Sequence, residues 1–406
     1  MIRSIAERWR ELSGRDNWKG LLNPLDLDLR RYIIHYGELA QATYDTFNSE
    51  RASKYCGSSL FSRKNLFSRV GLTNSNPFQY RATKYIYATS QVRMPSCFIM
   101  KSLSREAWNK ESNWIGYVAV ATDEGKKVLG RRDIVVAWRG TIQMLEWAND
   151  FDFPLVSATQ ILGEGTNAMV HRGWLSMYTS DDKHSQFNKT SARDQVTKEV
   201  KRLIQKYKNE ELSITCTGHS LGAALATLSS TDLAANHTSA DESPAARSIP
   251  VTAFVYASPH VGDLNFTRTV HNLLDLHILR IRNFPDLIPT YPLIGYSDVG
   301  EELMIDTRLS GYLKRPGDID SWHRLEGYLH GVAGTQGDGG GFKLALKRDP
   351  ALVNKVGEVL RNKYRVPAAW WCLKNRGMVQ LKDGSWTLDD HELDDPNDSD
   401  DDHPSP

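Results

Sequence analysis

Residues 218–222 read Gly-His-Ser-Leu-Gly, so that one serine lies between two glycines. A run of β-forming residues, 212–219, precedes Ser220, and an alanine- and leucine-rich stretch with helical spacing follows it. On a sharp strand-to-helix turn, this G-x-S-x-G spacing exposes the serine oxygen, because the glycines remove side chains that would clash. The following helix points its N-terminal amides at the site. The pattern therefore predicts that Ser220 is a nucleophile for acyl transfer.

The five-residue pattern is weak evidence by itself, because a chain of this length matches it by chance in about one case in ten. The alternative is a tight turn with a bystander serine. The neighbouring elements favour the nucleophile, because Ala223, Ala224 and Ala226 would let the helix pack closely on a sheet. A nucleophilic serine also requires a base, and the base requires an acid that orients it.

Several acids follow Ser220. When the nucleophile lies on such a turn, the expected chain order is serine, then acid, then histidine. Asp286 fits best, because it follows the end of the predicted strand 277–283, in a turn bounded by proline. Asp263 also follows a predicted strand and is the main competitor. The less well placed acids are Asp275, Asp298 and Asp306. The sequence predicts Asp286 as the orienting acid.

Two histidines in the segment 318–334 are candidates for the base. Asp320 or Ser321 can cap a helix there, which places His323 at the junction of loop and helix. His330 lies two turns further along, where it is expected to pack or bond within the helices. His219 is fixed beside the nucleophile and is badly placed as a base. The sequence predicts His323.

Acyl transfer also needs donors aimed at the developing oxyanion. The N–H of Leu221, next after the nucleophile, is the first expected donor. The second is expected from the loop after an earlier strand, where the sequence Trp-Arg-Gly-Thr ends at Thr141. Thr141 could donate both its amide and its hydroxyl. The alternative is that Arg139 and Gly140 only form a turn that ends the strand.

The elements around these residues alternate between strand and helix. Two strands, joined by the polar turn 123–127, are expected from residues 114 to 140, and a helix from 193 to 208. Further strands are expected at 251–259 and 277–283, and two helices after residue 320. Short connections and apolar central strands indicate a mostly parallel sheet covered on both faces. The fold class is therefore α/β.

The N-terminal part is expected to be helical. Residues 23–47 carry apolar residues at spacings of three and four, with Asn23 as a plausible N-cap and Pro24 in the first turn. No repeat and no clear linker divides the chain. We predict one domain over residues 1–388 and a disordered acidic tail over 389–406.

Composition excludes several classes of protein. The chain has 40% hydrophobic and 24% charged residues, no apolar run long enough to span a bilayer, and an N-terminus unlike a signal or transit peptide. The four scattered cysteines argue against a disulfide framework or a zinc site. A cytoplasmic location is expected, without a transmembrane segment, a metal, a cofactor or a nucleic-acid partner.

The charge is distributed unevenly. The net charge is +1, but residues 389–402 hold nine acids and no Lys or Arg, so the rest of the chain carries +10. A basic body could favour an anionic membrane surface. An evenly spread surface charge is an equally good interpretation of these numbers.

The motifs together resemble a known family. The Trp-Arg-Gly-Thr sequence, Gly-His-Ser-Leu-Gly, the Asp286 turn and the segment 322–330 are similar to the class 3 (fungal-type) lipases. The chain resembles more closely the cytosolic class II group of plant phospholipases A1, from about residue 5 to 388. That resemblance includes residues 85–90 and the tryptophan-rich segment 364–388.

The resemblance implies an α/β-hydrolase fold and a triad of Ser220, Asp286 and His323 that needs no metal or cofactor. Thr141 and Leu221 would form the oxyanion hole. It also implies hydrolysis of the sn-1 acyl ester of glycerophospholipids at a membrane or micelle surface, with activity on galactolipids or other acylglycerols. The alternatives are a different esterase or acyltransferase on the same scaffold, or a non-catalytic binding module.

Lipid substrates usually require an apolar flap over the site. The segment 148–170 is a candidate lid, because it carries Phe151, Phe153, Leu155 and Ile161 near glycines that could act as hinges. The alternative is an ordinary, partly buried connection.

Overall fold

The computed structural model describes most of the chain. The described residues are 2–73, 76–92, 99–108, 111–141, 154–236, 248–337, 339–371, 378–380, 382–383, 386–388 and 391–394.

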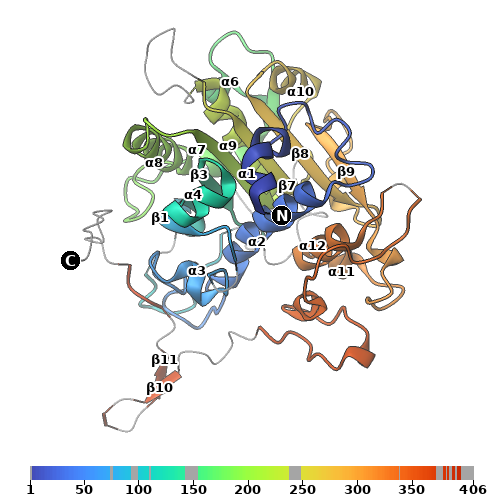
Figure 1. The fold of residues 1–406 in the computed structure, drawn as a ribbon. Coiled ribbons are helices and arrows are strands. Elements are labelled where there is room, and N and C mark those ends of the chain that lie inside the picture. The colour runs from blue at the N-terminus through green and yellow to red at the C-terminus, as the bar shows by residue number, and fades with distance from the viewer. Residues whose placement is uncertain are drawn as a thin grey trace, which may run out of the picture.

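A seven-stranded sheet forms the centre of the molecule (Figure 1), with the strand order β1-β2-β3-β6-β7-β8-β9. The strands are β1 (Tyr80–Ala88), β2 (Asn113–Ala121), β3 (Arg132–Trp138), β6 (Leu212–His219), β7 (Val251–Tyr256), β8 (Leu276–Asn283) and β9 (Glu301–Ile305). Strand β2 is antiparallel to both β1 and β3, whereas every neighbouring pair from β3 to β9 is parallel. The predicted α/β class with a mostly parallel sheet is confirmed.

Helices cover both faces of the sheet. One face is covered by α1 (Ile2–Leu12), α2 (Leu27–Asp45), α4 (Asp123–Leu129) and α12 (Leu325–Gly334). The other face is covered by α7 (Arg172–Thr179), α8 (Ala192–Lys206) and α9 (Leu221–Asn236). Successive residues of β3 alternate between the two cores, with Val135 in one and Val136 in the other. Burial on both sides explains why the central strands are continuous apolar runs.

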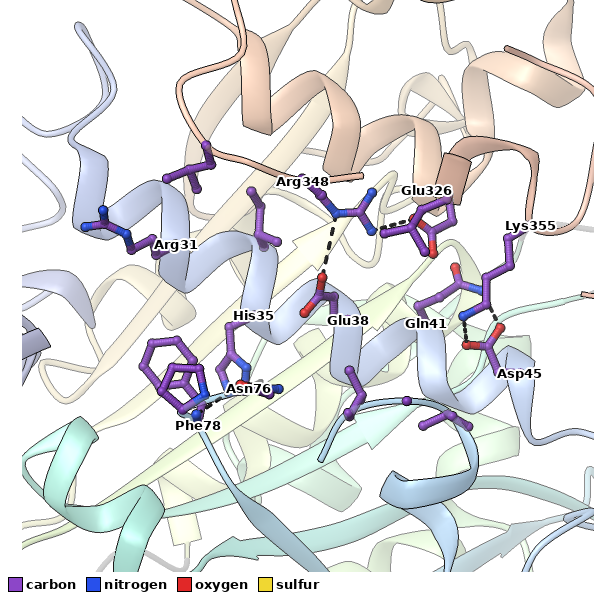
Figure 2. Close-up of a pocket in the computed structure, with 17 residues that line it drawn as sticks. Arg31, His35, Glu38, Gln41, Asp45, Asn76, Phe78, Glu326, Arg348 and Lys355 are labelled. Atoms are coloured by element: carbon purple, nitrogen blue, oxygen red, sulfur yellow. Dashed lines mark hydrogen bonds and ion pairs between the residues drawn. The ribbon is translucent and has the colours of Figure 1, made fainter. Parts of the chain in front are cut away.

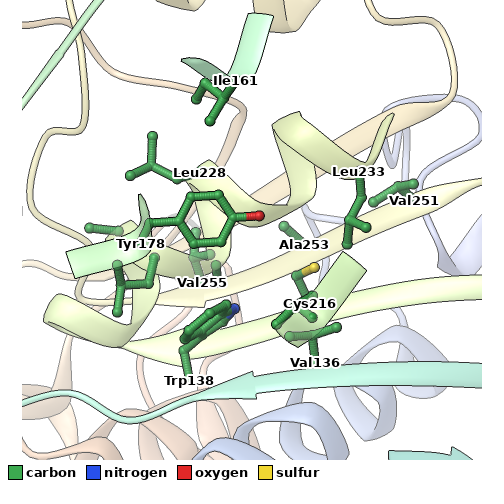
Figure 3. Close-up of a cluster of buried hydrophobic side chains, with 14 of the residues drawn as sticks. Val136, Trp138, Ile161, Tyr178, Cys216, Leu228, Leu233, Val251, Ala253 and Val255 are labelled. Carbon is green, nitrogen blue, oxygen red and sulfur yellow. The ribbon is translucent and has the colours of Figure 1, made fainter. Parts of the chain in front are cut away.

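The core on the α9 side contains the strand and helix on either side of Ser220 (Figure 3). Cys216 from β6, Val136 and Trp138 from β3, and Leu228 from α9 lie together there. Trp138 also donates its ring N–H to the Ser229 hydroxyl of α9, at 2.8 Å. The elements that meet at Ser220 are therefore joined by one packed core.

Two sequence predictions about local structure before β3 were wrong. The polar turn between β2 and β3 is the short helix α4, which Thr122 caps by accepting from the Gly125 N–H. Helix α2 begins at Leu27 rather than Asn23, because Asp26 is the N-cap and accepts from two backbone N–H groups. Pro24 follows a cis peptide bond outside the helix. Several polar residues near a helix start could act as caps, and only tertiary packing selects one.

The described part of the predicted lid, residues 154–170, is a packed connection. It contains β4 (Leu155–Ser157), α6 (Thr159–Leu162) and β5 (Met169–His171). Ile161 is fully buried in the core beside α9, so its assignment to a flap was wrong (Figure 3). Phe151 and Phe153 lie outside the described residues, and the flap itself stays a prediction.

The predicted tail is partly bound. Residues 391–394 contact the region around α3 (Leu66–Arg69), where Asp394 pairs with Arg63 and Glu392 pairs with Arg69. For these four residues the prediction of disorder was wrong, because the two carboxylates form ion pairs with the guanidinium groups of Arg63 and Arg69. The other tail residues lie outside the described part of the chain, and the domain boundary at 388 stays a prediction.

The smaller elements complete the fold. They are α10 (Leu264–His271), α11 (Ile319–His323), β10 (Met378–Gln380), β11 (Trp386–Leu388) and four short 3-10 helices, η1 (Ile288–Thr290), η2 (Thr307–Leu309), η3 (Pro350–Asn354) and η4 (Asn362–Tyr364). The two helices expected after residue 320 are α11 and α12, but the predicted cap was wrong, because Asp318 rather than Asp320 or Ser321 caps α11 by accepting from the Ser321 N–H. His323 is the last residue of α11. Among the described helices, none combines the length and apolarity that crossing a bilayer requires.

Candidate active site

Ser220 lies on a strained turn between β6 and α9. Its φ is +59°, in the left-handed region that a residue with a side chain rarely adopts. Its N–H donates to the Tyr256 carbonyl at 2.9 Å, and its carbonyl accepts from the Ala223 N–H at 2.9 Å. A Cβ on Gly218 would lie 2.1 Å from the Gly222 carbonyl oxygen, and one on Gly222 would lie 2.3 Å from that of Trp138. Both glycines are therefore needed where the backbones approach.

Asp286 and His323 form a buried pair. The His323 Nδ1 lies 2.6 Å from the Asp286 Oδ2, and both side chains are inaccessible to solvent. The same Oδ2 accepts from the Tyr328 hydroxyl at 2.6 Å, and Oδ1 accepts from the Ile288 N–H at 3.0 Å. Burial and the Asp286 charge keep the pKa of Tyr328 well above its usual value, so Tyr328 remains a donor. The carboxylate is thus held by three donors.

The donor arrangement determines which nitrogen of His323 could act as a base. With Nδ1–H directed at Asp286, Nε2 carries the lone pair. This Nε2 is buried and has no hydrogen-bond partner in the described structure. The ring lies 4.7 Å from that of His219, which is the residue directly before Ser220. An unpartnered, correctly polarised Nε2 therefore lies beside the turn that carries the serine.

His219 supports this arrangement in a way that sequence reasoning missed. Its Nε2 lies 2.6 Å from the carbonyl oxygen of His323, and its Nδ1 lies 2.8 Å from the Tyr44 hydroxyl. A carbonyl only accepts, so Nε2 carries the hydrogen and Nδ1 accepts from Tyr44. Burial keeps the pKa of His219 well below its usual value, so the ring stays neutral. Helix α2 thus fixes the backbone of His323 through two neutral hydrogen bonds.

A second contact fixes the same segment from β8. The Asn283 amide donates to the Trp322 carbonyl at 2.8 Å and to the Thr307 hydroxyl at 2.9 Å. The only sequence signal for these supporting residues was their polarity at positions next to predicted strand or helix ends. A buried Tyr or His requires a hydrogen-bond partner, but the sequence does not identify that partner.

Thr141 lies where the oxyanion donor was expected, just after β3. Its side chain is buried, and its hydroxyl oxygen has no partner among the described residues. A Cβ on the preceding Gly140 would lie 2.4 Å from the His219 carbonyl oxygen and 2.0 Å from the Tyr44 hydroxyl. Gly140 therefore lets this loop lie against the serine turn. Leu221 is the first residue of α9, so its N–H is one of those that lack an acceptor within the helix.

The competing acids have structural contacts elsewhere. Asp263 caps α10 by accepting from the Phe266 N–H, and Asp306 caps η2. Asp298 pairs with His260 and Arg280. The carbonyl of Asp275 accepts from the Val251 N–H.

His330 is also placed away from Asp286. Its Nε2 lies 2.8 Å from the Ser310 hydroxyl, and its ring stacks on Phe342. Of the two candidate histidines, only His323 contacts the predicted acid.

The chain is similar to known proteins of one family. Residues 135–296 match the family described as Lipase (class 3). The chain is 58% identical over 391 residues to Phospholipase A1-IIbeta of Arabidopsis thaliana, covering 96% of this chain and 94% of that protein. It is 57% identical over 394 residues to Phospholipase A1-II 1 of Oryza sativa subsp. indica, covering 97% and 98%.

Among solved structures, the chain is similar to the Lip2 lipase from Yarrowia lipolytica. The identity is 19%, the TM-score is 0.46, and 70% of this chain and 81% of that chain are covered. The sheet topology and the serine turn are those of an α/β-hydrolase. The chain belongs to the class 3 lipases and, within them, to the phospholipase A1-II group.

Proposed function

We propose that this lipase cleaves the sn-1 acyl ester of glycerophospholipids, with Ser220, His323 and Asp286 as its catalytic triad. The observation that carries the proposal is the buried Asp286–His323 pair, which leaves an unpartnered Nε2 beside the strained serine turn. The phospholipase A1 names of relatives at 50–58% identity support the substrate class.

In the proposed reaction, His323 Nε2 takes the proton of Ser220 as the serine oxygen attacks the acyl carbonyl carbon. Asp286 holds the imidazole tautomer and stabilises its charged form. The Leu221 N–H and Thr141 stabilise the tetrahedral oxyanion. His323 then protonates the departing lysolipid oxygen, and water hydrolyses the acyl-enzyme by the same route.

A fluorophosphonate probe tests the nucleophile, because it labels activated serines covalently. We expect the wild-type chain to be labelled and Ser220→Ala to remain unlabelled. Equal labelling of the two chains would refute the assignment. Comparison of His323→Ala with His330→Ala tests the base. Full activity of His323→Ala would show that the base is another residue.

The position of cleavage needs a phosphatidylcholine with a different label on each acyl chain. We expect release mainly of the sn-1 chain, and release mainly from sn-2 would refute the A1 assignment. The same assay with galactolipid and triacylglycerol separates a phospholipase from a general esterase. An acyltransferase would instead transfer the labelled chain to an added alcohol acceptor.

We also propose that the enzyme acts peripherally on lipid surfaces and resides in the cytoplasm. The buried thiols of Cys56 and Cys216, which are the described cysteines, are consistent with a reducing compartment. A fluorescent fusion should fill the cytosol. Its accumulation in plastids or in the secretory pathway would contradict the proposed location.

A further inference from the structure

The C-terminal segment 391–394 is bound along one strip of the surface. The His391 ring stacks on Tyr55, with ring centroids 4.4 Å apart and planes 23° apart. The His391 Nδ1 lies 2.6 Å from the Ser59 carbonyl oxygen, and the Glu392 N–H donates to the Leu60 carbonyl at 3.0 Å. Backbone and ring contacts therefore set the register of the segment.

Two carboxylates of this segment occupy well-defined anion positions. Glu392 accepts from the N–H and the hydroxyl of Ser62, both at 3.2 Å, from the Asn65 amide at 3.0 Å and from Arg69 at 2.6 Å. Asp394 accepts from the N–H of Arg63 at 3.0 Å and from its guanidinium at 2.6 Å. Backbone N–H groups and guanidinium groups are also the donors that bind phosphate esters.

These positions belong to a larger cationic surface, which we call the basic loops, residues 48–69 and 99–108. The two loops are joined by backbone hydrogen bonds from Leu103 to Arg51, at 2.8 Å, and from Trp108 to Lys54, at 2.9 Å. Leu103 is 72% exposed, although it is apolar. The loops hold two glutamates and seven basic residues, which are Arg51, Lys54, Arg63, Lys64, Arg69, Lys101 and Arg105.

The basic loops attach to the edge of the sheet that carries Ser220. Because β3 and β6 are parallel and Trp138 pairs with Gly218, both strands end at this edge. Strand β2 is antiparallel to β3 and pairs Gly116 with Trp138, so β2 begins at the same edge. At the start of β2, the Trp114 N–H donates to the Gly57 carbonyl at 2.8 Å. The loops therefore flank the catalytic edge.

We propose that the basic loops are a docking surface for an anionic lipid bilayer, and that segment 391–394 competes with lipid for it. The inference rests on the proposed lipid function, because it assigns how the catalytic edge meets its substrate surface. Arg63 and Arg69 bind lipid phosphate once Glu392 and Asp394 leave, and Leu103 enters the interface. Clusters of basic residues are attracted to anionic leaflets, by about 1 kcal/mol for each Lys or Arg near the surface. Residues 395–402, which lie outside the described part of the chain, hold five further acids in the sequence.

Sedimentation with vesicles tests the competition. All chains carry Ser220→Ala, so that no lipid is hydrolysed, and the vesicles are phosphatidylcholine with or without 30% phosphatidylglycerol, a composition of about one anionic lipid in three. We expect Glu392→Gln with Asp394→Asn to raise the partition coefficient on anionic vesicles about tenfold, because two guanidinium groups are released. High salt should remove the gain. Adding Arg63→Gln and Arg69→Gln to the same chain should also abolish it.

The matched control removes the same charge elsewhere. Asp123→Asn with Glu358→Gln breaks two surface ion pairs, with Arg132 and Lys314. An equal gain in this control, no gain in the released chain, or a gain that survives loss of Arg63 and Arg69 would each overturn the proposal. Binding of the released chain to polyglutamate but not to vesicles would also overturn it, in favour of an acidic protein partner. Hydrolysis of a monomeric short-chain ester by the wild-type chain tests the catalytic proposal separately.

Discussion

Helix α2 has two polar faces that are buried in different ways. The inner face directs Tyr36 and Tyr44 at the sheet, where their hydroxyls bond Asp133 and His219, both at 2.8 Å. The outer face carries a polar stripe, which is Arg31, His35, Glu38, Gln41 and Asp45. This stripe lines a cavity of about 440 Å³ beneath the segment 346–355 (Figure 2).

The outer face is held by charges. Figure 2 shows Arg348 between Glu326, at 2.5 Å, and Glu38, at 3.6 Å, while Lys355 pairs with Asp45. The Nη1 of Arg348 and both ring nitrogens of His35 have no hydrogen-bond partner in the described structure. Burial lowers the pKa of His35 to about 3, so this histidine is neutral.

The difference shows how one helix serves two purposes. On the inner face the hydrogen bond between Tyr44 and His219 is neutral and helps to fix the position of the site residues, whereas Tyr36 bonds the buried Arg131–Asp133 ion pair. Ion pairs on the outer face must overcome desolvation, so they add little net stability while intact, but removing one partner leaves a buried charge. We therefore expect changes near the inner face to affect the rate, and changes at the outer face to affect stability.

The largest expected effect is at the Asp286–His323 pair, which lies on the site side of the comparison. Asp286→Asn should lower kcat about 10⁴-fold, because an amide favours the wrong tautomer of His323. The melting temperature should change little, because the side chain keeps its size. Steady-state hydrolysis and a thermal melt measure the two effects. A loss of less than tenfold would show that Asp286 does not orient the base.

The next effect is at the outer face. Lys355→Met should lower the free energy of unfolding by about 3–5 kcal/mol, because Asp45 is left as a buried, unpaired carboxylate. Denaturant titration measures this change, and kcat of the folded protein should remain within about twofold. The matched control is Lys314→Met, which breaks the exposed pair with Glu358. This change should lower the free energy of unfolding by less than about 1 kcal/mol. Equal losses in both variants would contradict the contrast.

His330 of α12 provides a pH test near the outer face, because the Arg348 charge acts on its ring. Burial, with a contribution from the Arg348 charge, lowers the pKa of His330 to about 4. The unfolded chain has a higher pKa, so the unfolded state takes up the proton first as the pH falls. The stability that the neutral ring provides is complete above about pH 6.5 and is lost towards pH 4. Between pH 7 and 4.5 this loss amounts to about 2–3 kcal/mol.

His330→Gln should remove this part of the pH dependence and keep a partner for Ser310. Chemical denaturation at the two pH values measures the difference. His184→Gln, at an exposed position, is the control and should retain the wild-type dependence. If His330→Gln shows the wild-type slope, the buried ring does not stay neutral.

The smallest effect is expected at Tyr44. Tyr44→Phe removes the donor to His219 and loosens the carbonyl contact that positions His323. We expect kcat to fall about tenfold, which corresponds to about 1.4 kcal/mol, while KM is unchanged. Tyr207→Phe removes a distant hydroxyl that bonds Arg81, and it should leave both constants unchanged. A change in KM alone would show that Tyr44 acts on substrate binding.

The candidate site could largely be predicted from the sequence because its signals are local. Ser220 is marked by its own glycines and Asp286 by the end of a strand, whereas the cap that pointed to His323 was assigned to the wrong residue, because Asp318 caps α11 and His323 is its last residue. The supporting contacts of Tyr44 and Tyr328 could not be predicted, because each joins residues 42 or more positions apart. Only the packing of α2 and α12 on the sheet brings these groups together.

The contacts of the acidic tail could not be predicted from the sequence either. Its composition, nine acids without a cation, is typical of solvated chain. Composition cannot show that Glu392 meets Asn65 and Arg69, because these contacts span more than 320 residues. The specific donors, and not the charge density, determine where residues 391–394 bind.

The left-handed backbone at Ser220 has an evolutionary consequence. A serine at φ +59° is strained by roughly 1 kcal/mol relative to glycine, which adopts this conformation freely. Selection for hydrolysis therefore keeps a residue that the fold alone would not favour. Replacing Ser220 by glycine would relieve this strain, but the greater freedom of glycine in the unfolded chain would offset about 0.5–1 kcal/mol of the gain. Loss of the proposed nucleophile would therefore cost the fold little stability.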